Sequence, residues 1–141
     1  MPNKSKRIGE LKIPKKYFGD FLRGCFDGDG TCYSYWDPRW ASSFMFYIKF
    51  NSGSLSHLKW LQLKLKEYLR IKGHIASGRR CWQLRYAKKE SRILFGKMYY
   101  AENLPRLERK YKKLKTILTI DDKEINKSLP GRVMEPVYIY A

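Results

Sequence analysis

Two aspartates, Asp27 and Asp29, are the side chains best suited to chemistry, and both stand in the segment FLRGCFDGDG, residues 21–30. They follow an apolar stripe at helical spacing, so they fall at the C-terminal end of an expected helix. Because the helix dipole is negative at that end, two carboxylates there need a compensating cation. A divalent ion held by Asp29 would supply it, and the Gly28 carbonyl would add a second hard oxygen ligand.

The same segment also has a purely structural interpretation. A DGDG string is common in turns, and a turn explains the glycines. It does not explain two carboxylates beside a helix end on a strongly basic chain. A calcium loop is excluded, because Cys32 stands where that loop needs glycine. Metal binding and a plain turn both remain open from these residues alone.

Charge and composition narrow the class of partner. The chain has 141 residues, which fits one domain, and a net charge of +17. Such a field favours a polyanion, either nucleic acid or an anionic membrane. No apolar run approaches the roughly 20 residues that span a bilayer, and the N-terminus lacks the apolar core of a signal peptide. A ribosomal protein shares this composition, so that alternative stays open.

The cysteines and histidines point to the compartment and argue against zinc. Cys25, Cys32 and Cys81 are an odd number without metal-ligand spacing. We therefore expect free thiols in a reducing intracellular compartment, such as cytoplasm, nucleoid or an organelle matrix. With only two histidines, a zinc site is not expected.

The apolar pattern predicts a repeated αββ unit. The expected elements are a helix over 15–27, strands over 31–36 and 43–51, a helix over 55–69, strands over 74–77 and 81–86, and helices over 90–100 and 106–118. This order predicts an α+β fold, with an antiparallel four-stranded sheet and helices on one face. Residues 1–14 are expected to be a basic arm, and 119–141 a tail or an extra short helix with an extended segment.

The motif segment resembles that of the LAGLIDADG homing endonucleases, with residues 22–30 at its nine positions. The positions that match identically or conservatively are Leu22, Gly24, Asp27, Asp29 and Gly30, while those that depart are Arg23, Cys25 and Phe26. The segments 50–54, 82–86 and 104–114 are also similar to segments of that family. The element order αββαββα is that of the family, and the resemblance covers residues 15–118, the expected endonuclease domain.

The resemblance implies a homodimer, because a chain with one motif pairs its motif helix with that of a second copy. Phe21, Gly24 and Gly28 would lie at that contact, although Gly24 could instead pack within its own chain. Asp29 would hold Mg²⁺ with help from the Gly28 carbonyl, and Mn²⁺ or Ca²⁺ could substitute for binding. The metal would activate water and stabilise the leaving oxygen on each strand of double-stranded DNA.

Three further positions take roles from the resemblance. Asn51 would orient water, Lys110 would stabilise charge developing at the phosphate, and Asp27 would hold the helix end. Asn51 can equally be a turn residue before a helix. Lys110 can be one more lysine on a solvated helix, with Arg109 as a competitor. The second basic residue of the family's site has no clear counterpart; the nearby loop offers only His57.

The sheet would form a saddle over DNA. The expected contacts are Tyr33, Tyr35, Arg39, Tyr47, Lys49, Arg79, Arg80, Gln83 and Arg85. Arginine and glutamine can read base edges, while lysine mostly neutralises phosphate. Two subunits would bind a long, near-palindromic site and cut both strands, an activity tied in the family to intron or intein mobility. The alternative is a non-cleaving binder on the same scaffold, either an intron maturase that binds intron RNA or a DNA-binding regulator.

Overall fold

The structure is a computed structural model that describes residues 12–37 and 43–127. Arg39, one of the expected DNA contacts, lies outside the described residues. The elements in chain order are η1 (Lys15–Tyr17), α2 (Phe18–Asp29), β1 (Gly30–Trp36), β2 (Phe44–Ser52), α3 (Leu55–Leu69), β3 (His74–Ser77), β4 (Trp82–Tyr86), α4 (Lys88–Met98) and α5 (Glu108–Lys127). Within these ranges, no helix combines the length and the apolar character needed to cross a membrane.

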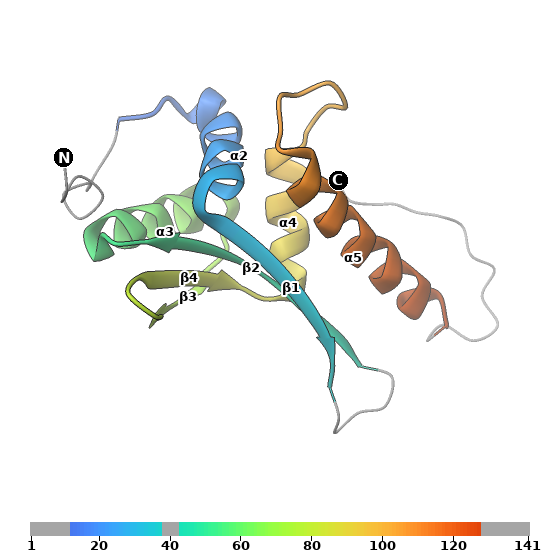
Figure 1. Ribbon diagram of the computed structural model, residues 1–141. Coiled ribbons are helices and arrows are strands. Elements are labelled where there is room, and N and C mark those ends of the chain that lie inside the picture. The colour runs from blue at the N-terminus through green and yellow to red at the C-terminus, as the bar shows by residue number, and fades with distance from the viewer. Residues whose placement is uncertain (1–11, 38–42, 128–141) are drawn as a thin grey trace.

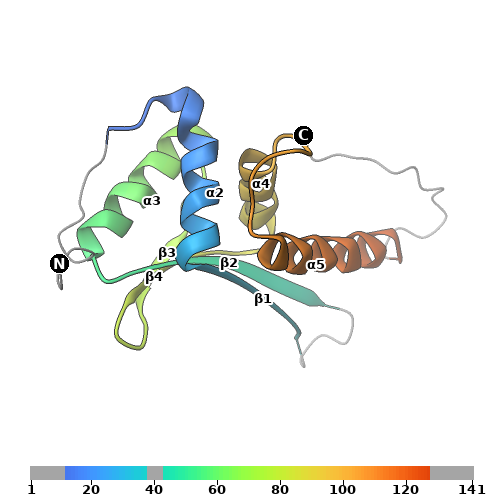
Figure 2. The ribbon, with the colours of Figure 1, turned by 45° about the horizontal axis from the view of Figure 1, so that its top comes forward.

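The expected α+β fold is confirmed. The strands form one antiparallel sheet in the order β1-β2-β4-β3, and the helices α2, α3, α4 and α5 lie on one side of it (Figure 1). In Figure 2 the two hairpins curve away from the helices, so the other side of the sheet is concave. We call that side the open face, because none of the described helices covers it.

The core lies between the helices and the sheet. Strand β2 alternates between buried and half-buried residues, and none of its four inward side chains is more than 3% exposed: Phe44, Phe46, Ile48 and Phe50. Helix α2 adds three side chains with no exposed surface, Phe18, Leu22 and Phe26. This two-residue alternation fixes which side of each strand faces the core, and therefore which side chains the open face presents.

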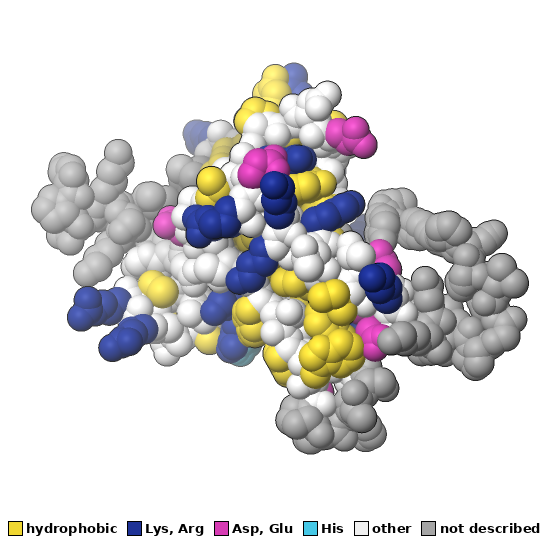
Figure 3. Space-filling view, turned by 45° about the vertical axis from the view of Figure 1, so that its right-hand side comes forward, with side chains coloured by type: hydrophobic (Ala, Val, Ile, Leu, Met, Phe, Trp, Pro, Cys, Tyr) yellow, Lys and Arg dark blue, Asp and Glu magenta, His cyan; other side chains and the backbone are white. Residues whose placement is uncertain are grey.

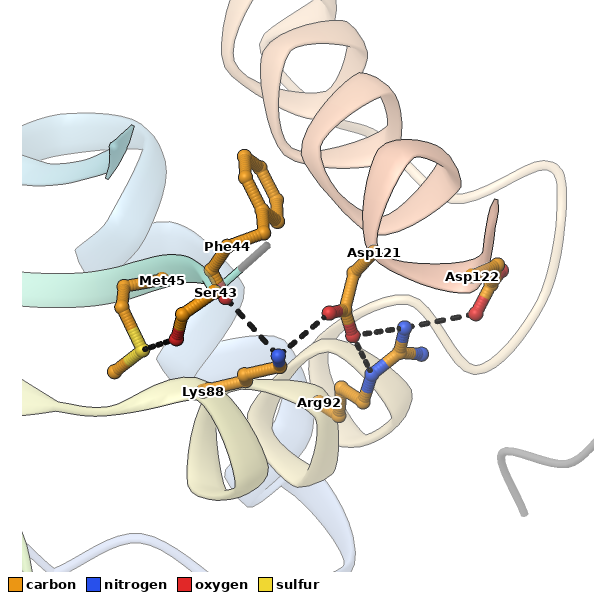
Figure 4. Close-up of polar contacts among 7 residues, drawn as sticks. All are labelled: Ser43, Phe44, Met45, Lys88, Arg92, Asp121 and Asp122. Carbon is orange, nitrogen blue, oxygen red and sulfur yellow. Dashed lines mark hydrogen bonds and ion pairs between the residues drawn. The ribbon is translucent and has the colours of Figure 1, made fainter. Parts of the chain in front are cut away.

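The last helix differs from the sequence expectation. It does not end near residue 118 but continues to Lys127, so residues 119–127 belong to a helix packed on the domain. Asp121 is fully buried there and pairs with Arg92 Nη2 at 2.6 Å and Lys88 Nζ at 2.9 Å (Figure 4). A buried carboxylate is stable only with such partners. The apolar pattern did not indicate this extension of the helix, because a charged residue, Asp121, anchors it.

Candidate metal site and nucleic-acid interface

The C-terminal end of α2 runs straight into β1 without a connecting loop. Gly30 follows Asp29 with extended backbone angles, φ −83° and ψ 160°. A side chain at Gly30 would lie 2.6 Å from the Cα of Phe26, so only glycine fits this close junction. The tight passage leaves Asp29 exposed at the corner between helix and strand.

Lys110 of α5 reaches this helix end. Its Nζ donates to the Gly30 carbonyl at 2.6 Å and the Phe26 carbonyl at 2.8 Å, and lies 3.4 Å from the Gly28 carbonyl. Burial lowers the pKa of Lys110, and the charge of Arg109 lowers it further, while the charges of Asp27 and Asp29 oppose the shift. The ammonium thus lies where the helix dipole and both carboxylates attract a cation.

Asp27 ties the same two helices from the other side. Its Oδ2 accepts a hydrogen bond from the Leu107 N–H at 3.0 Å, directly before α5 begins. Its Oδ1 is buried and has no hydrogen-bond partner among the described residues. We call the contacts of Asp27 with Leu107 and of Lys110 with the α2 carbonyls the α2–α5 clasp. The clasp fixes the end of α2, and with it the position of Asp29.

Asn51 holds Asp29 through the backbone. It lies within β2, and its Nδ2 donates to the Asp29 carbonyl at 2.7 Å. The residue that caps the start of α3 is Ser54 and not Asn51, since the Ser54 side chain accepts a hydrogen bond from the His57 N–H. The Asp29 carboxylate itself makes no hydrogen bond or ion pair within the part of the chain that the structure describes. It is therefore available to an external ligand.

The donors at this corner fit magnesium. The Asp29 carboxylate and the Gly28 carbonyl are hard oxygen ligands, as Mg²⁺ requires. Residues 12–37 and 43–127 contain no cluster of three His, Cys, Asp or Glu side chains that could enclose a metal ion. Mg²⁺ in nucleotide sites, however, keeps several waters and uses one or two carboxylates plus phosphate oxygens. The residues of one chain would therefore form only part of such a site, and phosphate and water would have to complete it.

Three tyrosines form a stack on the open face. The rings of Tyr33 and Tyr47 lie 5.1 Å apart at 14°, and Tyr35 stacks on both at 6.5 Å and 6.3 Å. A side-chain hydrogen bond with Tyr35 raises the pKa of Tyr47, and burial adds to the shift. Tyr35 is 42% exposed, so the stack presents both aromatic surface and hydroxyls on the open face. Each hydroxyl can both donate and accept a hydrogen bond.

Basic and amide side chains lie beside the stack. Lys49 Nζ is 5.0 Å from the centre of the Tyr33 ring, and Lys49 pairs across the ladder with Arg85. The pair Asn51 and Gln83 follows on the same face. Thr31, opposite Lys49 in β1, is exposed there too. The sequence expectation did not include Thr31, although the strand alternation places it with the tyrosines.

Two expected contacts lie away from the centre of the open face. Arg79 and Arg80 are exposed in the turn between β3 and β4, where Arg80 adopts a left-handed backbone with φ 64°. Basic side chains are not confined to the sheet, because the side of the molecule that α5 occupies also carries Lys and Arg (Figure 3). Positive charge alone therefore does not single out the open face, and the arrangement of tyrosines and amides is what distinguishes it.

The expected dimer residues differ in their surroundings. A Cβ added at Gly24 or Gly28 would meet nothing within 4 Å, and both glycines are exposed. Among the described residues Gly24 therefore has no intrachain packing partner. Phe21 is different, since its ring packs within the chain against Trp60 at 5.7 Å and Phe18 at 5.9 Å. The glycine side of α2 is open to close approach by another helix.

Two polar groups with structural roles were not expected from the sequence. Arg23 is buried on α2 and donates to the carbonyls of Met98 and Pro105, each at 2.8 Å. It thereby ties α2 to the segment between α4 and α5. His57, the only basic residue that the sequence offered near its loop, stacks on Trp60 at 5.9 Å. A charged residue in a predicted helix is expected to lie on the surface, so no feature of the sequence indicated that Arg23 is buried.

The three cysteines are free thiols, as expected. Burial raises the pKa of Cys25 to about 12, and the charge of Asp29 adds to the shift. The folded protein therefore keeps this thiol protonated at pH values where the unfolded chain, with its ordinary pKa of 9.0, begins to lose the proton. The resulting stabilisation is complete below pH 9.0 and is lost as the pH rises toward 12.

We expect iodoacetamide to label Cys25 at least about tenfold more slowly in the native protein than in urea at mildly alkaline pH, because the thiolate is the reactive form. Peptide mass spectrometry over a time course measures both rates in one experiment. Equal rates for Cys25 in the native and unfolded protein would contradict the burial of this thiol.

Comparison with known proteins gives matches in structure only. No family model matches the sequence, and no curated protein sequence is similar to it. One similar structure is the homing endonuclease I-CvuI in complex with the I-CreI target in the presence of Mg, with the DNA not cleaved: TM-score 0.56 and 17% identity over 82% of this chain and 72% of that one. Another is the homing endonuclease I-TnaI, with TM-score 0.52 and 14% identity over 80% and 76%. These likenesses show that the chain has a homing-endonuclease fold.

Proposed function

We propose that this chain is the subunit of a homodimeric, metal-dependent DNA endonuclease of the LAGLIDADG homing type. Its substrate would be double-stranded DNA carrying a long, near-palindromic site. One observation carries the proposal: Asp29 presents an unengaged carboxylate at the corner where α2 meets the sheet, and Asn51 of the open face holds that corner at 2.7 Å. The fold supports it, since one structural neighbour was solved on DNA in the presence of Mg.

The geometry of the corner supports the following roles. Asp29, with the Gly28 carbonyl, would hold Mg²⁺, for which Mn²⁺ or Ca²⁺ could stand in during binding. When bound, the ion would polarise the phosphate and lower the pKa of a water molecule. Asn51 and the α2–α5 clasp keep Asp29 in position, which matters because small displacements of catalytic groups reduce rates strongly.

The open face would bind and orient the duplex. Lys49 and Arg85 form a basic pair next to the tyrosine stack, and both would approach phosphates or base edges. Gln83 and the tyrosine hydroxyls offer uncharged hydrogen-bonding groups suited to reading bases. Arg79 and Arg80, in the turn at the end of the sheet, would extend the contact along the backbone of the DNA.

The dimer provides a prediction of its own. Leucine at Gly24 has open space within the chain and raises helix propensity by about 1 kcal/mol, so the fold should persist. If α2 contacts a second copy through its glycines, we expect Gly24→Leu to weaken dimerisation at least about tenfold. Analytical ultracentrifugation measures the dissociation constant, and circular dichroism confirms folding.

Gly96 on α4 supplies the matched control, since a Cβ there also meets nothing within 4 Å. Gly96→Leu should leave the dimer intact. A Gly24→Leu protein that dimerises as tightly as the wild type, or a wild type that is monomeric in ultracentrifugation, would argue against the proposed two-fold contact.

The proposed activity is tested on a plasmid library with a randomised insert. The protein is incubated with the library and Mg²⁺, and the ends of linearised plasmids are sequenced. We expect cuts on both strands at one shared motif with two-fold symmetry. A protein that shifts the DNA in gels but never linearises it with Mg²⁺ or Mn²⁺ would contradict the nuclease.

That outcome would favour the second candidate, a non-cleaving nucleic-acid binder such as an intron maturase or a DNA-binding regulator. The observation in its favour is that Lys110, the expected partner of the scissile phosphate, donates to backbone carbonyls instead. Binding of intron RNA in preference to duplex DNA, measured by competition, would identify the maturase.

A further inference from the structure

We infer that Lys110 is a built-in cation at the end of α2, a positioning residue that competes with a divalent ion for the Gly28 carbonyl. The inference deepens the proposed function and rests on its metal site at Asp29. It assigns Lys110 to the helix end, where it holds Asp29 in place before a metal ion arrives.

The hydrogen-bonding capacity of Lys110 supports this assignment. An ammonium group has three N–H donors and no acceptor. Three carbonyls lie around Nζ, those of Gly30 at 2.6 Å, Phe26 at 2.8 Å and Gly28 at 3.4 Å. Carbonyls at the end of a helix have few N–H partners within it. Here the Gly30 N–H donates to the Phe26 carbonyl, and Lys110 adds hydrogen bonds from another element to Phe26, to Gly28 and, just past the helix, to Gly30. In this arrangement no donor of Lys110 remains for a phosphate oxygen.

The position of the ammonium is fixed by its own helix. Asp27 accepts from the Leu107 N–H, so the start of α5 is anchored to the end of α2. Lys110 follows one turn later and points back to α2. The ammonium group of Lys110 is therefore held near α2, because the helix that carries it is anchored there. Releasing a carbonyl requires its side chain to move.

The Gly28 contact is where competition would occur. Gly28 supplies one of the proposed metal ligands, and its contact with Lys110 is the longest of the three. A divalent ion bound between this carbonyl and Asp29 would stand close to a positive charge, which repels it. Lys110 therefore lowers the affinity of the free protein for metal. Phosphate oxygens of bound DNA would offset that repulsion and favour metal binding only on the substrate.

The experiment measures Mn²⁺ binding to the full chain without DNA, by isothermal titration calorimetry. Lys110→Met removes the charge, and Lys112→Met on the exposed side of the same helix is the control. We expect Lys110→Met to bind Mn²⁺ at least about tenfold more tightly than the wild type, by removal of a like charge. Lys112→Met should stay near the wild type. Adding Asp29→Asn to Lys110→Met should abolish the gain.

A second uncharged variant keeps the test possible if the first one does not fold. Lys110→Gln retains an N–H donor for the carbonyls but no charge, so it serves if the methionine variant does not fold. Mn²⁺ affinity that is unchanged or weaker in the uncharged variants, or no Mn²⁺ binding by any of them, would overturn the inference. DNA cleavage by the wild type would survive that result. Conversely, tight Mn²⁺ binding by Lys110→Met in a protein that never cuts DNA would reject only the nuclease.

Discussion

Replacing Asp29 with asparagine is expected to reduce DNA cleavage at least about a thousandfold while leaving DNA affinity within a few-fold of the wild type. Asparagine keeps the size of the side chain but removes the charge that would hold the metal. The carboxylate is exposed, and the bond from Asn51 goes to the backbone carbonyl, so the fold does not depend on it. Single-turnover linearisation of a plasmid carrying the selected site measures the rate, and fluorescence anisotropy measures binding.

Glu67→Gln is the matched control for losing one carboxylate. Glu67 lies on α3, on the helical side of the sheet, and its side chain is 52% exposed. Its removal should change neither rate nor affinity. If Asp29→Asn lost binding together with cleavage, Asp29 would be a structural residue, and if it cut at the wild-type rate the proposed metal site would be wrong.

Reversing two charges on the open face is expected to weaken DNA binding about a hundredfold or more. Lys49→Glu and Arg85→Glu act on cross-strand partners, so together they remove a basic pair and place repulsion against phosphate. If each side chain contacts one phosphate, the slope of log affinity against log salt should fall by about 1.8 in magnitude. Anisotropy titrations at several salt concentrations give both quantities.

The control for this variant carries the same change in net charge. The control combines Lys59→Glu and Lys66→Glu on α3. Each substitution lowers the net charge by two, so the net charge falls from +17 to +13, as in the variant of the open face. Both lysines are exposed on the helical side of the sheet. We expect only a small loss of affinity from the reduced overall field. Equal weakening by the two double variants would show that general charge, and not the open face, binds the DNA.

The fold could be predicted from the sequence because it follows from the local pattern of apolar and polar residues. The alternation over residues 43–51 predicted which residues of β2 face the core, and through the ladder it determined the open face. The sequence did not predict the full length of α5, where the buried Asp121 anchors the helix through Lys88 and Arg92. A single carboxylate at helical spacing does not reveal whether distant cations will bury it.

The candidate site was predictable in its location but not in its contacts. The helix-end carboxylates and the glycines followed from the motif, and Asn51 does reach the Asp29 corner. Lys110 reaches it as well, but its partners are backbone carbonyls 80 to 84 residues away in the sequence. Backbone atoms carry no sequence signature, so residue types alone cannot show whether a lysine faces phosphate or a helix end.

A crystal structure of the protein with its selected DNA duplex and Ca²⁺ tests the central claim most directly. The proposal predicts two copies related by two-fold symmetry, with the tyrosine stack and Lys49 against the duplex. It also predicts an Asp29 carboxylate oxygen about 2.3–2.6 Å from an ion that contacts phosphate. A duplex lying on the helical side, or an Asp29 carboxylate that turns to solvent with no ion beside the DNA, would contradict it.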